Sequence, residues 1–152
     1  MTPWSLTVIE QALRASWAAD TCSPDDTARA PWTPDNPARG QCDITALVVH
    51  DVFGGDLVVA EVHLGKEQHG YHWWNRLASG VETDLTRDQF RAGQTLTEGR
   101  TVRRPPGRLP HRWEEYELLR GRVEERLGAV PAPGSVPAPA EPVRGASGSP
   151  PW

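Results

Sequence analysis

Cys42, His72 and Asp84, whose side chains together can perform thiol chemistry, follow one another along this chain. A cysteine thiolate can attack an acyl carbon while an imidazole takes up and returns the proton and a carboxylate orients the imidazole. The order nucleophile, base and acid therefore predicts a catalytic triad. In it Cys42 is the nucleophile, His72 the general base and Asp84 the orienting acid.

Cys42 follows Gly40 and Gln41 and precedes the apolar run 44–49, so we expect it to begin a helix. Unpaired N–H groups and the helix dipole at such a position favour an anion and lower the pKa of a thiol. The alternative is that Cys42 is a small buried apolar residue, as most free cysteines are. The histidine and the acid that follow favour catalysis.

His72 lies in a predicted strand in which side chains alternate between two faces. The alternation places His69, Tyr71 and Trp73 on one face, and His72 and Trp74 on the other. Tryptophans next to His72 can shield an imidazole from water, whereas His69 fits an exposed strand histidine better. We therefore assign the base to His72.

Asp84 lies in the next predicted strand, and neighbouring antiparallel strands bring such side chains within reach of each other. Its alternative use is as the N-cap of the helix that follows Leu85 and Thr86. Asn75 is the competing orienting group. It is only three residues from His72 on the same strand, so its side chain is expected to face away.

Gln41 precedes the predicted nucleophile, and its amide could donate a hydrogen bond to an oxyanion, as could the backbone N–H of Cys42. A loop hydrogen bond is the alternative role of Gln41. The other residues predicted to line the cleft are Asn36, Thr21, Trp73, Trp74 and Asn75.

A metal site is not expected. The histidines and the two cysteines lack paired ligand spacings such as Cys-x-x-Cys or His-x-x-x-His. His69 and His72 are three residues apart on one predicted strand, so alternation points their rings to opposite faces. The predicted chemistry requires no cofactor.

Composition limits the partners. The formal net charge is −4 and the pI is about 5.7, which argues against nucleic acid, because phosphate binding needs a basic surface. We expect no membrane partner and no signal peptide, because no apolar run has the length of a membrane span and the N-terminus lacks a basic start. These features predict a cytoplasmic protein in which Cys22 and Cys42 are free thiols.

The fold class predicted is α+β, with a buried helix that carries Cys42 packed on a small antiparallel sheet. The predicted elements are helices over 5–17, 43–53, 86–90 and 109–127, strands over 56–64, 69–77 and 81–85, and irregular segments over 20–40 and 91–110. Thr86 is expected to cap the short helix, with Gln89 three residues later. The domain covers 1–127, and the segment 128–152, rich in Pro, Ala and Gly, is predicted to be disordered.

Three segments resemble the YunG family, a group of small bacterial proteins. They are 32–49 with Asn-Pro-Ala-Arg-Gly-Gln-Cys, 72–76 with His-Trp-Trp-Asn-Arg, and 84–90 with Asp-Leu-Thr-Arg-Asp-Gln-Phe. The resemblance covers residues 5–127 and is to an actinobacterial type of the family. It implies the domain boundaries and does not specify a substrate.

The order of the three residues also resembles the transglutaminase and papain-like cysteine superfamily. That resemblance implies a papain- or transglutaminase-like core, with Cys42 as nucleophile, His72 as base and Asp84 as orienter. The chain departs from papain-like enzymes in one respect. Their oxyanion glutamine lies several residues before the cysteine, whereas Gln41 is adjacent to Cys42.

The function predicted from these residues is thiol-dependent acyl chemistry on an amide or ester, by hydrolysis or transfer through an acyl-enzyme. The substrate is expected to be a small molecule or a peptide. The alternative is a catalytically silent module that binds a small ligand or peptide in a cleft rich in tryptophan. A cysteine sulfur near one ring nitrogen of His72, with Asp84 near the other, distinguishes the enzyme from the module.

Overall fold

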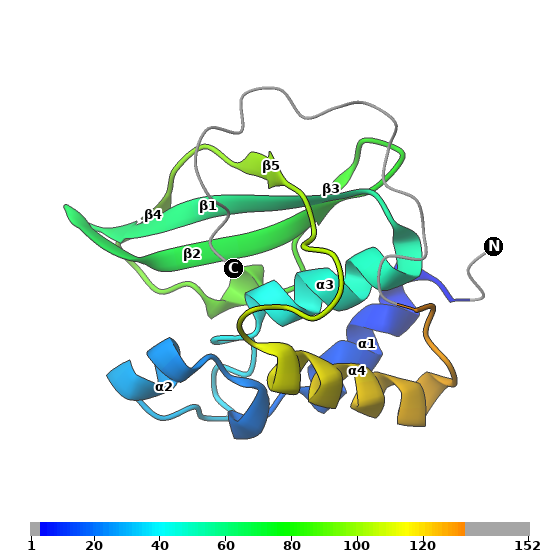
Figure 1. The fold of residues 1–152 in the computed structure, drawn as a ribbon. Helices are drawn as coiled ribbons and strands as arrows, with labels where there is room; N and C mark the ends of the chain where they lie inside the picture. The colour runs from blue at the N-terminus through cyan, green and yellow to red at the C-terminus, as the bar shows by residue number, and fades with distance from the viewer. Residues whose placement is uncertain (1–3, 133–152) are drawn as a thin grey trace.

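A computed structural model describes residues 4–132 of the chain and has the predicted α+β class (Figure 1). Along the chain the elements are α1 (Leu6–Ser16), η1 (Ala19–Thr21), α2 (Pro24–Arg29), α3 (Cys42–Phe53), β1 (Asp56–Leu64), β2 (Glu67–Arg76), β3 (Glu82–Thr83), η2 (Arg87–Gln89), β4 (Gln94–Leu96), β5 (Arg100–Val102) and α4 (Trp113–Leu127).

The sheet is antiparallel, and its strands lie in the order β3-β2-β1-β4, with β5 also paired to β1. The first three strands form the predicted meander. β4 and β5 lie within the segment 91–110, which was predicted to be irregular. Both are three-residue strands, too short for alternation to identify them, and both add to the free side of β1.

α3 lies directly under the sheet, and α1 and α4 cover its other side (Figure 1). Helix residues Ile44, Leu47, Val48 and Val49 are all at most 1% exposed. A helix that is apolar all round must be buried on every side, and this three-layer arrangement buries it. The prediction of a buried helix at this place is therefore correct.

Serine caps begin two of the helices. Ser5 accepts a hydrogen bond from the backbone N–H of Val8 at 3.2 Å, as expected for the start of α1. Ser23 does the same for Asp26 at 3.1 Å, and Pro24 is the first residue of α2. The prediction that 20–40 has no regular structure is thus wrong for its first part, where Ser-Pro is a helix start and not a turn.

A buried polar cluster joins the C-terminal half of α3 to α4. We call it the Asp51 cluster; its members are Asp51, Arg104, Tyr116 and Arg120. Arg104 Nη1 donates to Asp51 Oδ1 at 2.6 Å, and the Tyr116 hydroxyl donates to Asp51 Oδ2 at 2.5 Å. Because Asp51 is fully buried, these bonds replace the water that its charge has lost.

The chain remains packed beyond the predicted domain boundary at residue 127. Val130 is 6% exposed, and its carbonyl accepts a hydrogen bond from Arg120 at 2.7 Å. The first residues of the predicted tail therefore belong to the core, because Val130 supplies an apolar side chain against α4. The remainder of that prediction, residues 133–152, lies outside the described residues.

Within residues 4–132, the structure contains no helix that is both long enough and apolar enough to cross a membrane.

Candidate functional site

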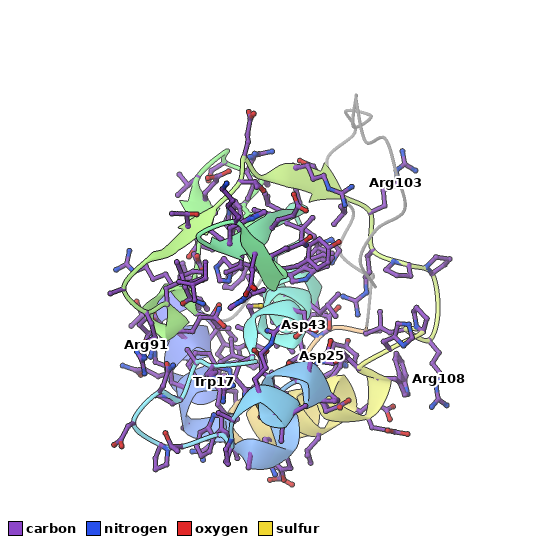
Figure 2. All side chains as sticks on the ribbon, turned by 90° about the vertical axis from the view of Figure 1, so that its left-hand side faces the viewer. Trp17, Asp25, Asp43, Arg91, Arg103 and Arg108 are labelled. Atoms are coloured by element: carbon purple, nitrogen blue, oxygen red, sulfur yellow. The ribbon has the colours of Figure 1, made fainter. Side chains whose placement is uncertain are left out.

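A cavity of about 1090 Å³ opens between α2, the first turn of α3, β2, the segment that begins at the last residue of η2, and the segment before α4. Its lining contains Cys42 and His72 together with Gln89. The cavity lining also contains acidic and basic side chains. Three of these charged residues, Asp25, Asp43 and Arg91, are labelled in Figure 2.

Cys42 is the first residue of α3, as predicted, and it meets β2 at the level of Tyr71 and Trp73. Its Sγ lies 3.8 Å from the Tyr71 carbonyl oxygen, a weak thiol hydrogen bond. Burial raises the pKa of the Cys42 thiol well above its usual range, and the neighbouring Asp43 carboxylate raises it further. The expectation that the helix start lowers this pKa is wrong here, because desolvation outweighs the dipole.

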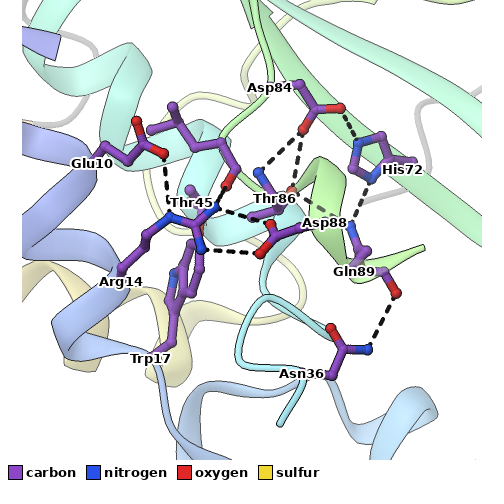
Figure 3. A network of polar contacts seen from close by, with 11 residues as sticks. Glu10, Arg14, Trp17, Asn36, Thr45, His72, Asp84, Thr86, Asp88 and Gln89 are labelled. Atoms are coloured by element: carbon purple, nitrogen blue, oxygen red, sulfur yellow. Dashed lines mark hydrogen bonds and ion pairs between the residues drawn. The ribbon is translucent and has the colours of Figure 1, made fainter. Parts of the chain in front are cut away.

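His72 is fully buried on β2, and its Nε2 lies 2.6 Å from Asp84 Oδ2 (Figure 3). The other carboxylate oxygen, Oδ1, accepts hydrogen bonds from the backbone N–H and the hydroxyl of Thr86 at 3.3 and 3.4 Å. Asp84 is therefore fixed between the strand histidine and its own turn. This is the contact between His72 and Asp84 that the sequence predicted.

The other ring nitrogen of His72 faces Gln89. The Gln89 amide nitrogen lies 2.8 Å from His72 Nδ1, so both ring nitrogens are hydrogen-bonded within the protein (Figure 3). The sequence predicted Cys42 in that place. The thiol instead bonds the backbone of β2, and the predicted contact between Cys42 and His72 is not formed, because the His72 ring stacks on Trp74 on the face of β2 that alternates away from α3.

Sequence reasoning missed Gln89 because it gave the residue another role. Thr86 and Gln89 have the spacing of a capping box, and the segment was predicted to be a capped helix. In the structure η2 is a single 3-10 turn, and the Thr86 side chain makes no capping bond to it. The glutamine amide is thereby free to reach the histidine.

Aromatic rings enclose the imidazole. Trp74 stacks on it with ring centroids 5.7 Å apart, and Phe90 approaches it edge-on at 4.5 Å. Trp74 was predicted to line the cleft, but it packs behind the ring, where it also contacts Gly99. Shielding of His72 from water is the role that the sequence assigned to its tryptophan neighbours, and Trp74 performs it.

The turn that carries Asp84 and Gln89 is fixed from two sides. Arg14 of α1 binds both carboxylate oxygens of Asp88 at 3.0 Å and the carbonyl of Leu85 at 3.0 Å. Asn36 donates to the Gln89 carbonyl at 3.2 Å (Figure 3). Asn36 also lines the cavity, as predicted, and its amide is used to hold this turn. We call His72, Asp84, Thr86 and Gln89 the His72 cluster.

Three of the predicted cleft residues face the protein interior. Gln41 is fully buried, and its amide donates to the Ala18 carbonyl at 3.1 Å, so it cannot reach an oxyanion in the cavity. Thr21 is fully buried in η1. Asn75 donates to the Ala46 carbonyl of α3 at 2.9 Å. Each amide or hydroxyl donates to a backbone carbonyl of a distant or neighbouring segment, which a sequence pattern cannot reveal.

Trp73 lies in the cavity lining as predicted, but it is only 4% exposed and belongs mainly to the core under the sheet. Alternation along β2 explains this placement, because Trp73 and Asn75 point toward α3 while His72 and Trp74 stack on each other.

Arg112 ties the start of α4 to the first turn of α3. Its guanidinium binds the Asp43 carboxylate through two hydrogen bonds of 3.0 and 3.1 Å, and it donates to the carbonyls of Thr21 and Gly40 at 3.0 and 2.8 Å. Its own backbone has φ 67°, a left-handed conformation that is uncommon for a residue with a side chain. Asp43 is thus neutralised beside Cys42, which limits its effect on the thiol.

Gly40 also has a left-handed backbone, with φ 72°. A Cβ atom at this position would lie 2.5 Å from Cys22 Sγ and 2.9 Å from the Ser23 nitrogen. Only glycine therefore fits between the first loop and Cys42. Cys22 is a free, buried thiol that fills the space under this glycine, and Cys42 is free as well, as predicted.

Within the described part of the chain, no group of three or more His, Cys, Asp or Glu side chains is placed to hold a metal ion.

Comparison with known proteins identifies the family. The YunG protein family model matches residues 5–128, which is most of the chain. The chain belongs to the YunG family. A relative from Bacillus subtilis (strain 168), described as an uncharacterized protein YunG, is 33% identical over 84 residues. That alignment covers 55% of this chain and 62% of the relative. No solved structure matches the chain.

Proposed function

We propose that this YunG-family chain performs thiol-dependent acyl chemistry on an amide or ester bound in the cavity. The observation that carries the proposal is that His72, fully buried and bonded to Asp84, lines the same cavity as Cys42. A buried imidazole held by a carboxylate is the arrangement that general-base catalysis requires. The order of the three residues, which resembles transglutaminase and papain-like enzymes, adds support.

In the proposed reaction the Cys42 sulfur adds to the acyl carbon while the thiol proton passes through one water to His72 Nδ1, because the His72 ring lies on the face of β2 opposite to Trp73 and Asn75, which point toward α3. Asp84 holds the opposite nitrogen and stabilises the imidazolium that forms. The proton then goes to the departing amine or alcohol as its bond to the acyl carbon breaks, which leaves a thioester on Cys42. Water or a second nucleophile cleaves the thioester, giving hydrolysis or transfer and restoring the thiol.

Because Cys42 is buried, its thiol can lose its proton only when a substrate is bound. A thiol with a raised pKa does not ionise by itself, so its proton must leave as the sulfur attacks the carbon. The substrate must therefore lie against the first turn of α3 before the nucleophile forms. A small molecule or a peptide segment fits a cavity of about 1090 Å³.

The second candidate function is a catalytically silent module that binds a small ligand or peptide in the same cavity. Two observations favour it: burial raises the pKa of Cys42, and both ring nitrogens of His72 are hydrogen-bonded within the protein. In this case the His72–Asp84 pair serves to hold the cavity wall. A module of this kind binds ligand without forming a covalent bond to Cys42.

Activated esters and peptide amides distinguish the two functions. The purified protein is incubated with a panel of them, and mass spectrometry of the digested protein locates the acyl group. We expect an acyl group on Cys42 in the wild type and in Cys22→Ser, and none at position 42 in Cys42→Ser. Replacing the base in His72→Gln is expected to slow acylation by about 100-fold or more.

Two results would contradict the enzyme. One is equal acylation of Cys22 and Cys42, and the other is an unchanged rate in His72→Gln with the fold intact by circular dichroism. Saturable, non-covalent binding of an uncleaved panel member would then support the module.

A further inference from the structure

Gln89 makes a hydrogen bond to the His72 ring that the proposed reaction does not use. Its amide nitrogen lies 2.8 Å from Nδ1, and the residue is half-buried at the cavity wall. Its backbone is fixed by the Asn36 amide at 3.2 Å and by its own N–H, which donates to the Thr86 carbonyl at 3.0 Å. The side chain can therefore swing while the backbone stays in place.

The chemistry of an amide decides where the ring proton lies. An NH₂ group can only donate, so Nδ1 must accept and carry no proton. The proton of the neutral ring is then on Nε2, where it points at Asp84 Oδ2 at 2.6 Å. Nδ1 with a free lone pair is the form that can take a proton from a thiol.

The hydrogen bond from the Gln89 amide also occupies the lone pair of His72 Nδ1. While the amide donates to Nδ1, the nitrogen cannot also accept the Cys42 proton, and the thiol stays on the Tyr71 carbonyl. The amide nitrogen also lies 3.4 Å from the Thr86 hydroxyl, a long contact that can keep one of its N–H groups paired, but the N–H that leaves Nδ1 needs a new acceptor, because an unsatisfied donor is costly. In the cavity that acceptor would be a carbonyl oxygen of the bound molecule.

We propose that Gln89 is a positioning residue that holds His72 with its proton on Nε2 and caps Nδ1 until a carbonyl group in the cavity draws the amide away. This inference rests on the proposed function for its consequence in catalysis. The state of the ring that it specifies can be measured whether or not the chain acylates Cys42. Residue 89 thereby couples arrival of a carbonyl compound to release of the base.

Long-range ¹H–¹⁵N spectra of the imidazole rings test this state directly, with the His72 signals assigned from their loss in His72→Gln. In the wild type at neutral pH we expect a pyridine-like Nδ1 and a protonated Nε2. Gln89→Glu replaces the donor by an acceptor, so Nδ1 should become protonated. Gln89→Met removes the donor at similar size and should move the Nδ1 signal without protonating it fully. Gln94→Met changes another cavity-lining glutamine and should leave both signals unchanged.

Alkylation of Cys42 by iodoacetamide tests the cap. With Nδ1 uncovered, Gln89→Met should alkylate about fivefold faster than the wild type, the scale of one neutral hydrogen bond. A protonated Nδ1 in the wild type, or a ring signal indifferent to both Gln89 variants, overturns the inference even if Cys42 is acylated. If the spectra are as expected but Cys42 is never acylated, the role of Gln89 in positioning the ring stands and only the proposed reaction is refuted. An alkylation rate that is unchanged in Gln89→Met refutes the cap.

Discussion

Two buried polar clusters flank α3, and they differ in what lies beside them. The Asp51 cluster is enclosed between α3 and α4, and Asp51 itself is fully buried. The His72 cluster reaches the large cavity through His72 and Gln89, and its carboxylate, Asp84, is 24% exposed. A cluster enclosed in the protein can only hold helices together, whereas a cluster beside a cavity can form hydrogen bonds to a bound molecule in place of its internal ones. The two clusters therefore differ in whether a ligand can reach their polar groups.

The sealed cluster should dominate stability. Asp51→Asn removes the carboxylate charge and leaves the Arg104 guanidinium, 8% exposed, without its counter-charge. Breaking a buried ion pair on one side costs about 3–5 kcal/mol, so we expect a loss of that size in the free energy of unfolding. Urea denaturation followed by tryptophan fluorescence measures it. Asp25→Asn at the cavity wall is the control and should change stability by less than about 0.5 kcal/mol. Equal losses in the two variants would show that the enclosed cluster is not special.

Low pH should reduce the free energy of unfolding through His50, which lies next to the Asp51 cluster. His50 of α3 is 6% exposed, and burial, aided by Arg104, lowers its pKa from 6.5 to about 4. The folded state then binds fewer protons than the unfolded state between pH 6.5 and 4. The His50 contribution is therefore fully present above pH 6.5 and is lost as the pH falls to about 4, by roughly 3 kcal/mol.

Unfolding free energies measured across that pH range, in the wild type and in His50→Gln, isolate this effect. The difference between the two curves should shrink or reverse toward pH 4, because only the wild type has a buried imidazole to protonate. Parallel curves would assign the acid sensitivity to other groups.

The cavity-facing cluster should contribute less to stability and more to reactivity. Asp84→Asn keeps the size of the side chain and removes its charge, and solvent at the cavity limits the loss of folding free energy to about 1 kcal/mol. Acylation of Cys42, if His72 is its base, should fall by about 100-fold or more, because the imidazolium loses its partner. Urea denaturation and the acylation assay on the same sample give the two numbers. A stability loss as large as that of Asp51→Asn would remove the distinction between the clusters.

Much of the fold follows from the sequence, because the signals involved are local. The apolar run after Cys42 predicts α3 and its burial, and β1 has the predicted bounds of 56–64. The sequence also predicts that Asp84 reaches His72, although Asp84 lies one residue beyond β3 and not within a strand. α3 and β1 share a local signal, because each contains an apolar run that ends at a glycine or a turn.

The parts that the sequence does not reveal depend on contacts between distant segments. Gln89 has a capping-box spacing, and only the three-dimensional structure shows that its amide goes to the ring instead. From its place before a helix start, the Gln41 amide could bind an oxyanion. Only the three-dimensional structure shows that it donates to the Ala18 carbonyl instead. The pKa of Cys42 follows the same rule, since local position lowers it while burial by β2 raises it.

The hydrogen bonds from Arg112 to the loop carbonyls and to Asp43 have a consequence for folding during synthesis. The anchor at the base of the cavity comes from the last helix of the described chain, although Cys42 lies in its first third. A ribosome releases the N-terminal segments first, so the helix that bears the cysteine emerges long before the arginine that secures it. The surroundings of Cys42 are therefore completed only after Arg112 has been synthesised, and a chain cut short before this residue has the cysteine without these contacts.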